Sequence, residues 1–145
     1  MKLRNYDLYL KKIKAYCKSV ELEIQFVEVF EGEGEYRPNR RKVIIATKDF
    51  SESQILSTLL HEIGHFEDDL RNPKRFSQKY HYWGYEWINQ ERNLTLNQKE
   101  AVLRAELSAW KNARALALKL RIPLGKWFKK DERESLNTYR AVKTV

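Results

Sequence analysis

The sequence predicts an α+β fold in one domain that spans residues 1–145. Three observations support this class: helical periodicity covers most of the chain, two short segments in the N-terminal third carry strand patterns, and capping boxes mark the starts of two long helices. No repeat or low-complexity linker divides the chain. A chain of 145 residues is long enough to bury a core without disulfides.

The N-terminal third predicts a helix and two strands. Apolar side chains recur on one stripe over residues 4–18, with lysines between them, which is typical of an amphipathic helix. Over residues 20–26 apolar and polar side chains alternate, as in a half-buried strand, and the alternation slips after Phe26, which indicates a β-bulge. Glycine, proline and asparagine predict turns over residues 31–39. Residues 42–47 form the second strand, which we expect to pair antiparallel with the first in a small antiparallel sheet.

The rest of the chain predicts three helices. A capping box at residues 51–54 (Ser-Glu-Ser-Gln) opens a helix to about residue 70, where an Asn-Pro pair ends it. A second box at residues 95–98 (Thr-Leu-Asn-Gln) opens a long helix, rich in alanine and leucine, to about residue 121. A C-terminal helix is expected over residues 127–142. The segment between the two boxed helices contains an aromatic run at residues 80–87 and has no clear period.

Composition excludes several classes of protein. Hydrophobic residues make up 42% of the chain and charged residues 33%, the balance of a soluble globular protein rather than a disordered one. No apolar run approaches the roughly 20 residues that a membrane helix needs, and the first residues are too polar for a signal peptide. Cys17 is the single cysteine, which excludes an internal disulfide. We therefore expect a monomeric cytoplasmic protein without a membrane partner.

The net charge of +8 bears on partners rather than on the fold. Basic residues cluster at residues 37–42, 71–79 and 119–130. These clusters could face nucleic acid, an acidic protein or solvent alone, and charge does not decide among the three.

One pattern carries specific chemistry: His61-Glu62-Ile63-Gly64-His65, in the helix that the first capping box opens. Residues four apart lie on the same face of a helix, so both imidazoles can bind one zinc ion at the usual 2.0–2.1 Å. Glu62 lies beside the metal, where it can act as general base toward a zinc-activated water. The alternative is a pair of surface histidines on a charged helix.

A catalytic zinc needs a third protein ligand and an open position for water. The residues after His65 lack the glycine and the third histidine of a metzincin extension. Glu106 lies on an apolar stripe of the long helix, where an unpaired carboxylate is costly, and we expect it to be the third ligand. Two alternatives stay open: Glu106 pairs with Arg71 or another basic residue, or His81 binds the metal.

The motif and its surroundings resemble a known family. Residues 59–65, which follow a two-stranded segment and precede Glu106 and Ala109 in a Glu-x-x-Ala pattern, resemble the gluzincin metallopeptidases. Among these, the chain looks most like the compact ImmA/IrrE-like proteins and the stand-alone peptidases of phages and mobile elements. The resemblance spans about residues 20–123.

This resemblance implies a minimal zincin-like fold, with the motif helix packed on the long glutamate-bearing helix. It implies zinc ligation by His61, His65 and Glu106. It also implies that Glu62 is the general base, and that the strand at residues 42–47 edges the cleft and pairs with an extended substrate. The chain departs from the family pattern at Trp110 and Asn112.

Three further residues and one segment have alternative interpretations. Asp68 and Asp69 could orient a metal-bound histidine or form a solvated acidic patch. Tyr139 could donate to an oxyanion or pack in the core. The aromatic run at residues 80–87 could form a lid that hinges at Gly84, or could belong to the core.

The sequence thus predicts a zinc-dependent endopeptidase that hydrolyses an intracellular protein or peptide. Three other functions stay open: a zincin-fold binding or inhibitor protein that cleaves nothing, a basic nucleic-acid-associated protein, and a zinc hydrolase that is not a peptidase.

Overall fold

The computed structural model describes residues 2–73 and 93–143. Within them the chain is α+β, as predicted. The elements are the helices α1 (Tyr6–Ser19), α2 (Glu52–Arg71), α4 (Leu96–Lys119) and α5 (Lys126–Lys143), the 3₁₀ helix η1 (Pro38–Arg40), and the strands β1 (Glu23–Val27), β2 (Gly34–Arg37) and β3 (Lys42–Ala46). None of the described helices combines the length and the apolarity that crossing a lipid bilayer requires.

The sheet is mixed, not antiparallel as expected. Its strand order is β1-β3-β2, so β3 is central. β3 pairs parallel with β1 and antiparallel with β2. The predicted antiparallel pairing of the first strand with residues 42–47 is therefore wrong. The reason is that the segment predicted as turns contains β2, so the chain reverses direction twice between β1 and β3, and these two strands run the same way.

Two smaller expectations about the strands are also wrong. The register between β1 and β3 runs without interruption through Phe26 and Val27, so no bulge follows Phe26. Because β3 has a neighbour on each side, it cannot edge a cleft, and the outer strand next to α2 is β2.

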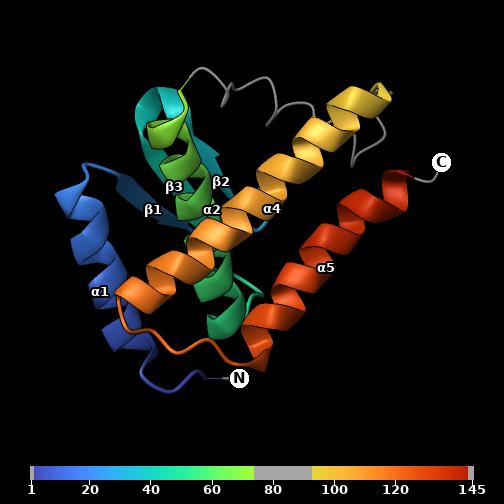
Figure 1. Cartoon of the computed structure of the whole chain (residues 1–145). Helices are drawn as coiled ribbons and strands as arrows, with labels where there is room; N and C mark the ends of the chain where they lie inside the picture. Colours follow the sequence, from blue (N-terminus) through green and yellow to red (C-terminus); the bar gives the residue numbers. More distant parts are fainter. Residues whose placement is uncertain (1, 74–92, 144–145) are drawn as a thin grey trace.

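α2 is the central helix of the molecule. Every residue from Ile55 to Phe66 is buried, which requires neighbours on all sides of the helix. The sheet packs on one side and α4 on another, so α2 lies between them (Figure 1). The predicted capping box is present: the Ser51 side chain accepts from the Gln54 N–H, and the Gln54 side chain accepts from the Ser51 N–H.

A close contact sets the separation of α2 and α4. A Cβ atom at Gly64 would lie 2.1 Å from the Ala109 carbonyl oxygen, so only glycine fits there. The Asn112 side chain on α4 donates to the Gly64 carbonyl oxygen at 3.0 Å. These contacts hold together the two helices that carry the motif and Glu106, as predicted for the motif helix and the long helix.

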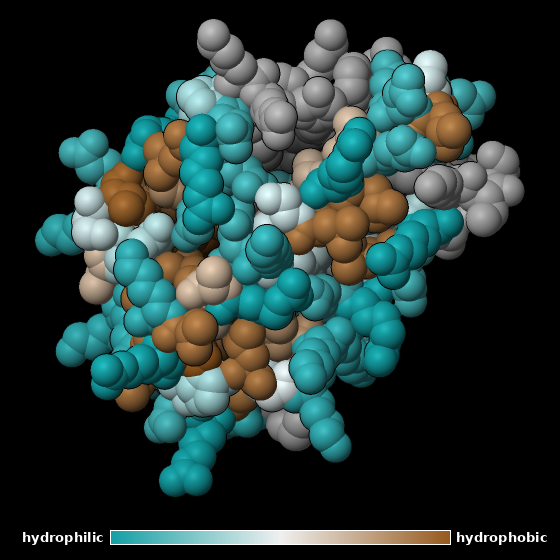
Figure 2. Space-filling model, viewed as in Figure 1, coloured by the Kyte–Doolittle hydropathy of each residue, from teal (hydrophilic) through white to brown (hydrophobic). Residues whose placement is uncertain are grey.

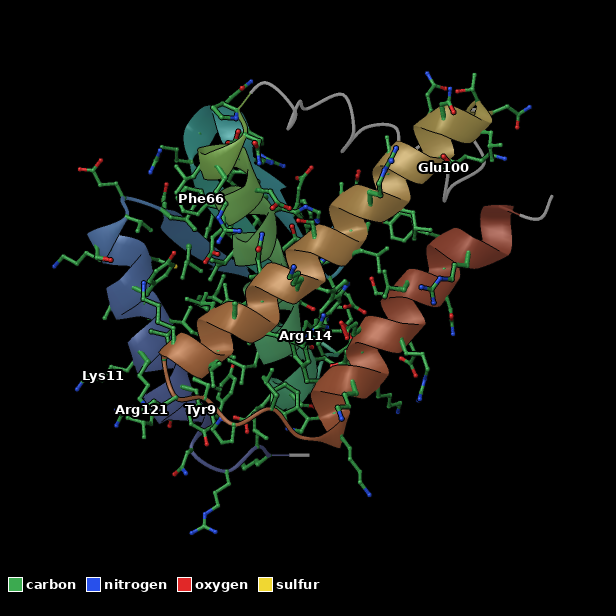
Figure 3. All side chains as sticks on the ribbon, viewed as in Figure 1. Tyr9, Lys11, Phe66, Glu100, Arg114 and Arg121 are labelled. Carbon is green, nitrogen blue, oxygen red and sulfur yellow. The ribbon has the colours of Figure 1, made fainter. Side chains whose placement is uncertain are left out.

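α5 packs across both of these helices. Near its start, the Phe128 ring meets the Trp110 ring edge-on, with 5.3 Å between centroids. The Ser57 hydroxyl of α2 donates to Asp131 at 2.6 Å. Arg114 of α4, which lies between α4 and α5 in Figure 3, pairs with Glu132. The expected C-terminal helix is thus present and tied to both α2 and α4.

Candidate metal centre

α2 presents two imidazoles on one face. His61 and His65 are one turn apart, and their ring centroids lie 4.7 Å from each other with the planes at 70°. Both residues are buried. The alternative of two surface histidines is therefore wrong, because neighbouring elements cover the whole middle of this helix.

Glu106 on α4 meets both rings. Its Oε2 lies 2.8 Å from His61 Nε2, and its Oε1 lies 3.3 Å from His65 Nε2. The carboxylate is buried, and this pairing accounts for an acid on the apolar stripe of α4. Arg71, the alternative partner, lies instead beside Glu67 and donates to Asn112. The other alternative ligand, His81, lies outside the described residues.

The three side chains fit a metal ion. One ligand atom from each lies within 4.8 Å of the other two. Two atoms bound at 2.0–2.1 Å in a tetrahedral site are about 3.3 Å apart. The 2.8 and 3.3 Å separations are near this value, and each joins one imidazole to a different oxygen of Glu106. Two histidines and one glutamate form a ligand set of catalytic zinc sites and leave a fourth position for water. The buried group of His61, His65 and Glu106 can therefore hold a metal ion.

The charges in the group favour a cation. Burial alone would lower the pKa of His61, but the carboxylates of Glu106 and Glu62 oppose it and raise the pKa to about 10. Burial would raise the pKa of Glu106, whereas His65 and His61 hold it well below its usual value. The ion-free protein thus keeps a proton on the imidazole beside an ionised carboxylate, at a position where a metal ion can replace that proton.

Glu62 lies beside His61 and does not belong to the group. Its Oε1 is 3.4 Å from His61 Nδ1, and the residue is buried. A buried carboxylate next to a metal position is suited to take up and release a proton.

Tyr139 on α5 reaches the same carboxylate. Its hydroxyl donates to Glu106 Oε1 at 3.1 Å. Burial and the Glu106 charge raise the pKa of Tyr139 well above its usual value, so the hydroxyl stays protonated at neutral pH. Tyr139 also packs with Leu94 and Val102. The packing expected from the sequence is thus confirmed, and the hydroxyl lies in the candidate site, while its role toward an oxyanion stays a prediction.

Two residues that the sequence marked only as departures support the centre. The Trp110 ring stacks on the His61 ring, with 4.3 Å between centroids and 20° between planes. Asn112 joins α4 to α2 through Gly64 and Asp68. An aromatic face thus fixes the orientation of the His61 ring, a role that carboxylates or carbonyls often serve at metal sites.

Asp68 and Asp69 tie neighbouring elements to α2. Asp68 accepts from Ser108 and Asn112 of α4, both at 2.8 Å. Asp69 accepts from the Tyr36 hydroxyl of β2 at 2.6 Å. Both carboxylates thus have structural partners, which differs from the solvated patch that their spacing allowed.

Comparisons of the chain with protein-family models, with curated proteins and with solved structures found no significant match.

Proposed function

We propose that this chain is a zinc-dependent endopeptidase of an intracellular protein or peptide, with a minimal zincin-like fold. The observation that carries the proposal is the convergence of a buried carboxylate from α4 with two imidazoles from α2. In this proposal zinc is held by His61, His65 and Glu106. The donor set supports a transition metal, because magnesium and calcium prefer sites made of oxygen ligands alone.

The residues around the centre suit peptide hydrolysis. When bound, zinc supplies a Lewis acid that lowers the pKa of a coordinated water and polarises the scissile carbonyl. Glu62 takes the proton of the attacking water on its carboxylate and passes it to the leaving amine nitrogen. Tyr139 keeps its proton at neutral pH, and its hydroxyl, which donates to Glu106 in the ion-free protein, would turn to donate to the oxygen that becomes negative during the attack.

β2 is suited to hold an extended peptide. The Glu33 carbonyl accepts from the Ala46 N–H at 2.9 Å, so in the antiparallel alternation the backbone groups of Gly34 and Tyr36 point to the outer edge of the sheet. The hydrogen bonds from Thr58 to Glu33 and from Tyr36 to Asp69 keep this strand alongside the motif helix. A substrate that pairs with this edge passes beside the metal centre.

The test of the proposal is the substitution Glu62→Gln. The variant keeps the shape of the side chain and all three ligands, so we expect it to bind one equivalent of zinc like the parent. Peptide cleavage should fall at least about a hundredfold, the usual scale for a general base. On purified protein, metal analysis measures the zinc content, and turnover of an unstructured protein substrate such as casein measures the cleavage.

Glu67→Gln is the matched control, because it makes the same change in the same helix on the face opposite the motif. Its zinc content and its turnover should stay within about twofold of the parent. A Glu62→Gln protein that cleaves at the parental rate would exclude the mechanism. Zinc binding without turnover of any substrate by the parent would favour the binding or inhibitor protein instead.

A further inference from the structure

The outer face of α5 carries a row of cations that the proposed peptide chemistry does not use. At 100° per residue, five exposed basic side chains fall within about 100° of one another around the helix axis. They are Lys126, Lys129, Lys130, Arg133 and Arg140. From the first to the last, the row extends about 21 Å at 1.5 Å per residue.

The acids of α5 lie outside this row. Asp131 and Glu132 face inward, where they bind Ser57 of α2 and Arg114 of α4. Glu134 flanks the row and lies 4.0 Å from Lys130, with both side chains more than half exposed. Over residues 2–73 and 93–143, the other four cations of the row have no acidic partner. The positive potential of this face is therefore largely uncancelled.

The chemistry of the face distinguishes between two kinds of acidic partner. The sixth residue on the same arc is Asn137, so the row contains no apolar or aromatic side chain. Protein partners usually need such side chains as buried anchors at the centre of an interface. A phosphodiester backbone needs only cations and hydrogen-bond donors, and duplex DNA offers one negative charge per about 1.7 Å of its axis. A nucleic acid fits this face better than an acidic protein does.

We infer that the outer face of α5 binds the phosphate backbone of a nucleic acid, without reading its sequence. Hydrophilic side chains cover α5 at the lower right of the view in Figure 2. The inference is independent of the proposed peptidase function, because the middle of the row lies about 130° around the axis of α5 from Tyr139, which faces the metal centre.

Fluorescence anisotropy of labelled oligonucleotides tests the inference on the full chain. The probes are a DNA duplex of about 20 base pairs, a single-stranded RNA of similar charge, and polyglutamate of matched charge. Between about 50 and 200 mM salt, affinity for the DNA or the RNA should fall steeply. In a plot of log affinity against log salt concentration, each duplex phosphate that the protein contacts adds about 0.9 to the magnitude of the slope. In the triple variant Lys126→Glu, Lys129→Glu and Arg133→Glu, the magnitude of this slope should fall by about three, and affinity at 100 mM salt should fall at least about tenfold.

The control reverses three exposed cations on one face of α1, with the substitutions Lys11→Glu, Lys14→Glu and Lys18→Glu. It changes the net charge by the same amount, and Figure 3 shows Lys11 pointing away from the body of the molecule. This variant should keep its affinity within about threefold. Equal losses in both variants would show that net charge alone attracts the probe and would overturn the inference. So would polyglutamate binding as tight as nucleic acid binding, or no saturable binding of either nucleic acid.

Metal content and circular dichroism check that each variant is folded. If the triple glutamate variant of α5 unfolds, the triple glutamine variant at the same positions decides the question, because it removes the charges without adding repulsion. In the glutamine variant, the slope of log affinity against log salt concentration should fall in magnitude by about three, and an unchanged slope would overturn the inference.

Discussion

At the scale of single residues, Glu106 joins the two helices of the candidate centre. Both of its oxygens face imidazoles of α2, so Glu106→Ala removes the one proposed ligand that comes from α4. We expect zinc affinity to fall at least about a hundredfold, more than the loss usual for a supporting residue. Competition with a chromophoric zinc indicator measures the change.

Glu100→Ala is the matched control for this prediction, since Glu100 belongs to the same helix and lies toward its start, away from the centre (Figure 3). Its zinc affinity should equal that of the parent. If Glu106→Ala also kept the parental affinity, the third ligand would have to come from elsewhere, and His81→Ala would be the next variant to measure.

The residues of the candidate metal group were predictable from the sequence, whereas the residues that support them were not. His61 and His65 belong to one helix, so their spacing alone predicts that they meet. Glu106 stood out because a charged residue interrupted an apolar stripe. The roles of Trp110 and Asn112 depend on what α2 places opposite them. These contacts form only when two distant helices pack, and no periodicity within α4 predicts them.

At the scale of elements, the contact between α2 and α4 sets the geometry of the centre. In Gly64→Ala the new Cβ would lie 2.1 Å from the backbone oxygen of Ala109, so the helices must separate. We expect the free energy of unfolding to drop by about 1–3 kcal/mol, the range for overpacked cores. Zinc affinity should drop as well, because Glu106 moves away from the imidazoles. Chemical denaturation of the metal-free protein and zinc titration give the two values.

Gly32→Ala makes the same change where a Cβ meets nothing within 4 Å. Its free energy of unfolding should stay within about 0.5 kcal/mol of the parent. A Gly64→Ala protein as stable as this control would show that the two helices adjust at no cost, and that their separation does not depend on the glycine.

Helices and strands differed in how well the sequence predicted them. The starts of α2 and α4 were predicted because Ser51 and Thr95 bond locally to their own helices. β2 was missed because its four residues, which begin with glycine and are followed by proline, show too few alternations to be recognised as a strand. Without β2, an antiparallel pairing of β1 and β3 was the simplest expectation. Strand order depends on contacts between distant segments, which local patterns do not contain.

At the scale of the whole molecule, the centre links elements from distant parts of the chain. α2 and α4 supply the three side chains that could hold a metal ion, and α5 reaches Glu106 through the Tyr139 hydroxyl. A metal ion that binds only the folded chain stabilises it by an amount that grows with the ratio of free ion to dissociation constant. The zinc-loaded protein should therefore unfold at a higher temperature than the chelated one. At a hundredfold excess over the dissociation constant, the gain is about 2.7 kcal/mol.

This gain should depend on pH in a defined direction. In the ion-free protein His61 has a pKa raised to about 10 by Glu106 and Glu62 against the opposing effect of burial, so zinc must displace its proton. Protonation of His61 stabilises the ion-free fold. This contribution is fully present below about pH 6.5, the pKa of the imidazole in the unfolded chain, and is lost as pH rises toward 10. Zinc binding strengthens over the same window, because displacing the proton costs less. The difference in melting temperature between loaded and chelated protein should thus widen from about pH 6 to 8, and calorimetry at several pH values measures it. A difference that stays constant, or that narrows, would mean that zinc does not replace a proton at His61.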